Sequence, residues 1–133
     1  MIRKVGIAAS IAGFTGVAIG AFGAHSLKPM LLKWAMYDVW VTGVQYHLVH
    51  SLALLAGWAA LRNNQTGDNS KQTSALSPLL WAARLWSLGI GMFSGSLYAL
   101  ALGAPKRIAV LTPVGGWFLL GGWAAIGYAA LKN

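Results

Sequence analysis

Residues 5–24, VGIAASIAGFTGVAIGAFGA, form an unbroken apolar run that directly follows Arg3 and Lys4. A helix needs about 20 apolar residues to cross the hydrocarbon core of a bilayer, and this run has that length. A secretory signal peptide has a shorter apolar region of about 7–15 residues and ends in a cleavage site of small residues. Phe22 makes the end of this run a poor cleavage site, so we predict a retained transmembrane helix.

Three further apolar runs of similar length follow, at residues 40–61, 85–104 and 108–131. Hydrophobic residues make up 57% of the 133 residues and charged residues only 9%, whereas a soluble domain carries about 25% charged residues. We therefore predict an all-α membrane protein whose residues 1–133 form a single transmembrane domain, a bundle of four transmembrane helices.

The connections between the runs differ in character. Residues 28–39 mix apolar and aromatic side chains with Lys33 and Asp38, which predicts a short helix lying in the headgroup plane between the first two spans. Residues 62–78 are polar and rich in turn formers, which predicts a long connection. Residues 105–107 predict a tight hairpin that makes the last two helices antiparallel neighbours.

The net charge of +8 comes from ten Lys and Arg residues scattered in ones and twos between the apolar runs. Basic residues in that arrangement anchor helix ends to lipid headgroups. Nucleic-acid binding normally needs a clustered basic face, so we predict no nucleic-acid partner. Six of the ten positive charges fall on the side of the two termini, which favours cytoplasmic termini. The chain has no cysteine, which excludes disulfides, thiolate metal sites and cysteine nucleophiles.

Small residues recur in the first span at alternating spacings of three and four, a period of 3.5 that is typical of left-handed helix packing. Further glycines recur at intervals of four in the third span and seven in the fourth. These positions predict close helix contacts, either within the chain or at an oligomer seam. The predicted helix-packing residues are Gly6, Ala9, Gly13, Gly16, Gly20, Gly23, Gly91, Gly95, Gly115 and Gly122.

Polar side chains at membrane depth are costly and usually face the interior of a bundle or a cavity. A rise of about 1.5 Å per residue places several of them at similar depth in one half of the bundle. The predicted polar cluster comprises His25, Gln45, Tyr46, His50, Ser94, Ser96, Tyr98 and Thr112.

Two chemical interpretations of this cluster are open. His47 and His50 are three residues apart, so they are weak candidates for a metal pair, and a haem or quinone pocket built on His50 is an alternative. Neutral histidines that hydrogen-bond across helices would explain the same pattern without a bound metal or cofactor. No carboxylate lies within the apolar runs to orient a histidine, and no nucleophile elbow is present. We therefore predict no catalytic residues, no metal and no cofactor, but expect bound lipid.

Four blocks of the sequence resemble a known family. The first is Gly20-Ala21-Phe22-Gly23-Ala24-His25, and the second is Thr42-Gly43-Val44-Gln45-Tyr46 followed by His50 and Leu52-Ala53-Leu54-Leu55. The third is Phe93-Ser94-Gly95-Ser96-Leu97-Tyr98 with Ala99-Leu100-Ala101-Leu102, and the fourth is Thr112-Pro113-Val114-Gly115-Gly116 followed by Gly122-Trp123. In that order they resemble the YgdD-like small membrane proteins, a family of unknown function found in bacteria and mitochondria. The resemblance implies a four-helix protein of the bacterial inner membrane and implies no activity. His47 departs from the family pattern, in which glutamine is common.

The leading functional hypothesis is a non-enzymatic accessory or scaffold subunit, held to a larger membrane complex or to copies of itself. The small size, the glycine stripe and the lack of a complete catalytic set favour it. One alternative is a binding or transport protein for a small lipophilic or neutral solute, with its site in the polar layer around His50. Another is a redox subunit that binds a metal, haem or quinone.

Overall fold

The computed structural model describes the backbone of residues 1–63 and 72–132, and every element in these ranges is a helix. The prediction of an all-helical protein is confirmed for them. In chain order the elements are α1 (Ile2–Ala24), α2 (Lys28–Lys33), α3 (Tyr37–Asn63), α4 (Gln72–Gly89), the π-helix η1 (Ile90–Ser94), α5 (Gly95–Ala101), the 3-10 helix η2 (Lys106–Val110) and α6 (Leu111–Lys132).

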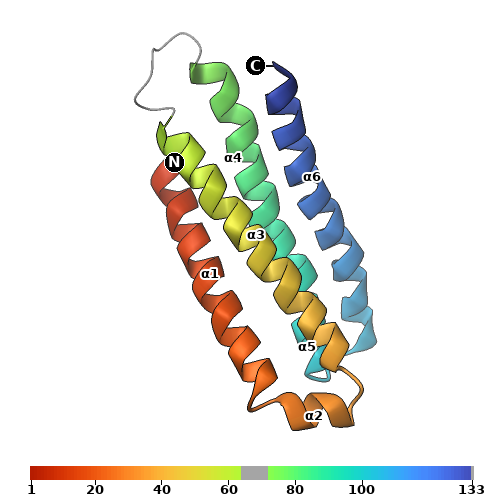
Figure 1. Cartoon of the computed structure of the whole chain (residues 1–133). Helices are drawn as coiled ribbons and strands as arrows, with labels where there is room; N and C mark the ends of the chain where they lie inside the picture. The colour runs from red at the N-terminus through yellow and green to blue at the C-terminus, as the bar shows by residue number, and fades with distance from the viewer. Residues whose placement is uncertain (64–71, 133) are drawn as a thin grey trace.

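Three stretches in the described ranges are long and apolar enough to cross a membrane: α1, α3, and η2 with α6. They correspond to the predicted runs 5–24, 40–61 and 108–131, with α1 and α3 each beginning three residues earlier. The remaining predicted run, 85–104, is divided among the end of α4, η1, α5 and the turn that follows. Figure 1 shows α4 and α5 following one another along the same line beside α6.

The connections are shorter than the sequence pattern suggests. The short helix predicted over 28–39 is limited to α2, Lys28–Lys33, because α3 already begins at Tyr37. The polar connection predicted over 62–78 is helical at both ends, since α3 continues to Asn63 and α4 begins at Gln72. Its central residues 64–71 lie outside the described residues. After α5 the chain turns at Gly103, whose φ of +92° favours glycine.

The buried side of α3 forms the centre of the structure. Its buried residues recur at spacings of three and four, as expected of a helix that packs along its whole length. They are Trp40, Gly43, His47, His50, Leu54, Gly57 and Leu61, and Ser51, next to His50, is buried as well. Helix α1 packs against α3, and α4 packs against α6. Figure 1 shows α1 and α3 side by side, with α4 and α6 behind and beside them.

The small residues of α1 lie on the side that faces α3. A Cβ at Gly16 would approach Leu48 to 2.8 Å, and one at Gly20 would approach Val44 to 3.2 Å. The remaining members lie as follows: Gly6 against the Trp58 ring, Gly23 against the Trp40 ring, Ala9 in the core, and Gly13 with open space beside it. The stripe therefore lets bulky α3 side chains approach the α1 backbone closely.

The glycines of the second half divide into two kinds. Gly115 on α6 lies directly against the backbone of Phe93 in η1, and Gly122 lies against the Trp86 ring of α4. At Gly91 and Gly95, by contrast, an added Cβ would meet no described atom of another helix within 4 Å. The close approach of η1 and α4 to α6 thus depends on Gly115 and Gly122.

Candidate functional site

His47 is the centre of a hydrogen-bonded chain that joins three helices. Its Nδ1 lies 3.2 Å from the hydroxyl of Tyr98 on α5, and its Nε2 lies 3.4 Å from Oγ1 of Thr15 on α1. The Thr15 hydroxyl also lies 2.8 Å from the carbonyl of Ile11. Every group is satisfied when Tyr98 donates to Nδ1, Nε2–H donates to Thr15, and Thr15 donates to Ile11. His47 therefore links α1, α3 and α5 through both of its ring nitrogens.

His50 joins α3 to α6 through a second chain. The Nε1–H of Trp123, which can only donate, lies 3.2 Å from Nε2 of His50. Nε2 must then be the unprotonated nitrogen, so Nδ1 carries the proton and donates to the carbonyl oxygen of Tyr46 at 2.7 Å. The Trp86 ring packs nearby, with its centroid 5.1 Å from that of Trp123. These contacts select one tautomer of a neutral, buried imidazole.

A third polar group lies where α5 meets α6. The hydroxyls of Ser96 and Thr112 are 2.7 Å apart, and the Ser96 hydroxyl also donates to the carbonyl of Phe93 at 2.9 Å. Ser94 is fully buried, and its hydroxyl has no hydrogen-bond partner among the described residues. The predicted single layer is therefore three separate groups, centred on His47, His50 and Ser96.

Two members of the predicted cluster lie outside these groups. Gln45 is exposed on α3, and His25 is exposed just after the end of α1. Tyr46 is 44% exposed and contributes its carbonyl oxygen to His50, while its ring packs against Phe93 with the centroids 4.5 Å apart. Similar depth along the helix axis does not place residues on the same side of the helix, so only part of the predicted set meets.

The arrangement leaves the histidines little capacity for ligand chemistry. Both ring nitrogens of His47 and both of His50 already contact protein groups. A metal or haem iron needs a free nitrogen lone pair, so binding one would break a helix-to-helix hydrogen bond. Within the described part of the chain, no group of three His, Cys, Asp or Glu side chains is placed to hold a metal ion.

Sequence reasoning missed Thr15, Trp123 and the central position of His47. The spacing that reveals His47 is present in the sequence, because residues 40, 43, 47, 50, 54, 57 and 61 alternate by three and four. That alternation places His47 on the same helix side as His50 and Gln45 on another. Trp123 belongs to the fourth block of the family resemblance, but that block does not indicate its contact with His50, which depends on how α6 is rotated against α3.

Comparison with known proteins gives a consistent result. A family described as "Protein of unknown function (DUF423)" matches residues 19–116. The chain is 38% identical over 126 residues to a UPF0382 membrane protein of Haemophilus influenzae, covering 93% of this chain and 90% of that one. Over 127 residues it is 38% identical to the UPF0382 inner membrane protein YgdD of Escherichia coli K12 (95% and 88% covered). It is also 36% identical over 126 residues to the UPF0382 membrane protein YwdK of Bacillus subtilis (95% and 94%). No solved structure matches the chain.

Proposed function

This chain belongs to the DUF423 (UPF0382) membrane protein family, and we propose that it is a non-enzymatic accessory or scaffold subunit of the inner membrane. It would bind a larger membrane complex or further copies of itself. Membership confirms the resemblance drawn from the four sequence blocks. The family description assigns no function, so the proposal rests on the surfaces and contacts of this chain.

The proposal includes four membrane crossings, with α4, η1 and α5 together forming the third. These elements run without interruption from Gln72 to Ala101, and 30 helical residues extend about 45 Å, enough to cross a bilayer. Four crossings place both termini on one side, which we propose is the cytoplasm, with α2 at the opposite surface. Because the chain has no native cysteine, single cysteines near each helix end and a membrane-impermeant thiol reagent test this topology directly.

The observation that carries the functional proposal is the position of Trp117 on α6. Its side chain is 74% exposed, and it makes no hydrogen bond to any described residue. It lies about 17 Å along the helix from Lys106, close to the middle of a hydrocarbon core about 30 Å thick. Tryptophan is typical of the membrane interface rather than its centre, and an indole N–H without an acceptor in an apolar medium costs about 1–3 kcal/mol. A partner helix that supplies an acceptor would remove that cost.

Gly91 and Gly95 support the same proposal from another surface. They are four residues apart and have no described atom of another helix beside their Cα positions. Gly-xxx-Gly pairs allow close backbone approach between transmembrane helices, and here that capacity is unused within the chain. The polar groups around His47 and His50 are instead mutually satisfied, which favours a structural role for the interior and an associative role for the surface.

Photo-crosslinking in native membranes tests the proposal. A photoreactive amino acid at position 117 is expected to form a crosslink to a protein, either another membrane protein or a second copy. Phe14 on α1 is the matched control, since it is 77% exposed and lies about 18 Å along α1 from Ile2. It has no N–H group to satisfy, and we expect it to face lipid. Crosslinking to lipid alone at position 117, as at position 14, would argue against the proposal.

A further inference from the structure

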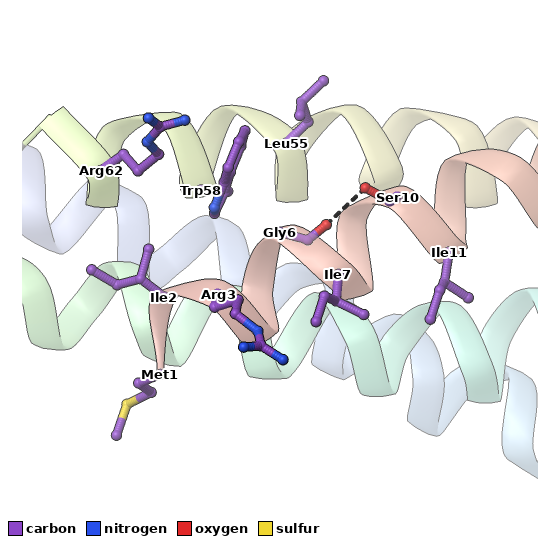
Figure 2. Close-up of a pocket in the computed structure, with 10 residues that line it drawn as sticks. All are labelled: Met1, Ile2, Arg3, Gly6, Ile7, Ser10, Ile11, Leu55, Trp58 and Arg62. Atoms are coloured by element: carbon purple, nitrogen blue, oxygen red, sulfur yellow. Dashed lines mark hydrogen bonds between the residues drawn. The ribbon is translucent and has the colours of Figure 1, made fainter.

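A groove runs between the first turns of α1 and the last turns of α3 (Figure 2). It has a volume of about 670 Å³, and its walls include the apolar side chains of Ile7, Ile11 and Leu55. Figure 2 shows Arg3 on the α1 rim and Arg62 on the α3 rim, near the end of the groove where the N-terminus lies. Their guanidinium groups extend to opposite sides of the groove, so its N-terminal end is basic on both rims while its length is lined by apolar side chains.

A second groove of similar design lies on another side of α1, next to α4. Its volume is about 750 Å³, and its lining includes Lys4, Trp81, Arg84 and the apolar Leu88. Consecutive residues on a helix point about 100° apart, so Arg3 and Lys4 serve different grooves. A groove with basic residues at one end and an apolar lining thus occurs twice around the N-terminal turns of α1.

An arginine lies over a tryptophan ring in each groove. The guanidinium of Arg62 is 5.3 Å from the ring centroid of Trp58, and that of Arg84 is 5.4 Å from that of Trp81. A guanidinium held by its face against an aromatic ring can use its N–H edge for a bidentate acceptor such as phosphate; in this structure Nη2 of Arg84 donates to Sδ of Met1 at 3.9 Å, a contact that a phosphate would replace. These contacts preorganise both arginines at the level where headgroups meet the hydrocarbon.

The positive charges of the two grooves have no described carboxylate near them. Asp38 is the one acidic side chain in the described ranges, and it lies about 36 Å from Arg62 along α3. Among the described residues, Arg3, Lys4, Arg62 and Arg84 therefore gather positive charge at one end without a carboxylate beside them.

We propose that each groove binds one anionic phospholipid, with its phosphate at the basic end of the groove and an acyl chain along the apolar wall. Paired cations select the negative headgroup, and the apolar wall selects a ligand with a hydrocarbon tail. A soluble anion would not use that wall, and an apolar protein helix would leave the cations unpaired. This site is independent of the partner surface at Trp117.

Native mass spectrometry of the purified full chain, titrated with dioleoylphosphatidylglycerol, tests the proposal. We expect two tightly bound phosphatidylglycerol molecules, and one after the double change Arg3→Gln and Arg62→Gln, which weakens that site about thirtyfold. Lys106→Gln with Arg107→Gln is the matched control. It removes the same charge from exposed residues at the opposite end of the molecule and should leave both lipids bound.

Dioleoylphosphatidylcholine is the second arm, because its headgroup carries no net charge while its chains are identical. It should bind at least tenfold more weakly than phosphatidylglycerol. Arg62→Lys keeps the charge but loses the stacked, bidentate guanidinium, so it should bind the second lipid more weakly than wild type and more tightly than the Arg3/Arg62 double variant, which separates loss of charge from loss of folding. Equal retention by the Arg3/Arg62 and Lys106/Arg107 variants, or equal binding of the two lipids, would overturn the proposal.

Discussion

Replacing Gly115 by alanine is expected to force η1 away from α6. A Cβ at this position would overlap the backbone nitrogen of Phe93 and lie 2.8 Å from its Cα and 2.9 Å from the carbonyl carbon of Met92. Backbone atoms cannot rotate aside as a side-chain tip can, so the two helical segments must separate.

The adjacent Gly116 provides the matched control for the magnitude. Its added Cβ would lie 3.8 Å from the Phe93 ring, an ordinary van der Waals contact. Both changes gain the same helix propensity, up to about 1 kcal/mol, and that gain cancels when the variants are compared. The difference in their free energies of unfolding is therefore the overpacking cost, about 1–3 kcal/mol.

The assay is reversible unfolding of the monomer in mild detergent, titrated with a denaturing detergent and followed by tryptophan fluorescence. Gly115→Ala should unfold at a lower denaturant fraction than wild type, and Gly116→Ala at an equal or higher one. If Gly115→Ala proved as stable as Gly116→Ala, the contact between η1 and α6 as described here would be incorrect.

Two further predictions use the same assay. Ser96→Ala should lower the free energy of unfolding by about 1 kcal/mol because it removes the hydroxyl that bonds to α6. Ser94→Ala should be neutral or stabilising because its buried hydroxyl has no described partner. Equal losses of stability at both serines would contradict this assignment. Trp123→Phe should destabilise the monomer by about 1–2 kcal/mol because it leaves Nε2 of His50 without its donor. Trp117→Phe loses no described hydrogen bond and should leave the stability unchanged. A larger loss of stability for Trp117→Phe than for Trp123→Phe would count against the tautomer derived for His50.

The sequence predicted the three long apolar helices α1, α3 and α6 with their approximate ends because apolar length is a one-dimensional property, but α4 begins at Gln72 rather than at residue 85. The depth of each polar residue in the membrane stays a prediction. The sequence did not predict the side of the helix on which each residue lies, and that side decides which residues are in contact. Gln45 and His47 differ by only about 3 Å along the helix axis, yet Gln45 is exposed and His47 is buried. The side of a helix that becomes buried depends on how that helix packs against its neighbours. The α1 glycine stripe indicates this packing for α1 and α3 only.

The π-helix is the feature of the fold that could not be predicted from the sequence. Residues 85–104 look like one uniform apolar helix, but five of them, Ile90–Ser94, widen into a π-helix. The close approach of Phe93 to Gly115 and the unpartnered hydroxyl of Ser94 both occur in this segment. A π-turn depends on contacts with neighbouring helices rather than on local propensity, so composition alone gives no sign of it.

We propose that this protein works by binding other membrane proteins or further copies of itself. This proposal is tested most directly by gentle purification from native membranes, followed by mass spectrometry and metal analysis of everything that co-elutes. We predict a stoichiometric protein partner, or a second copy of the chain, that is lost when Trp117 is replaced by leucine. A monomer that carries a tightly bound metal or small molecule and no protein partner would contradict the claim.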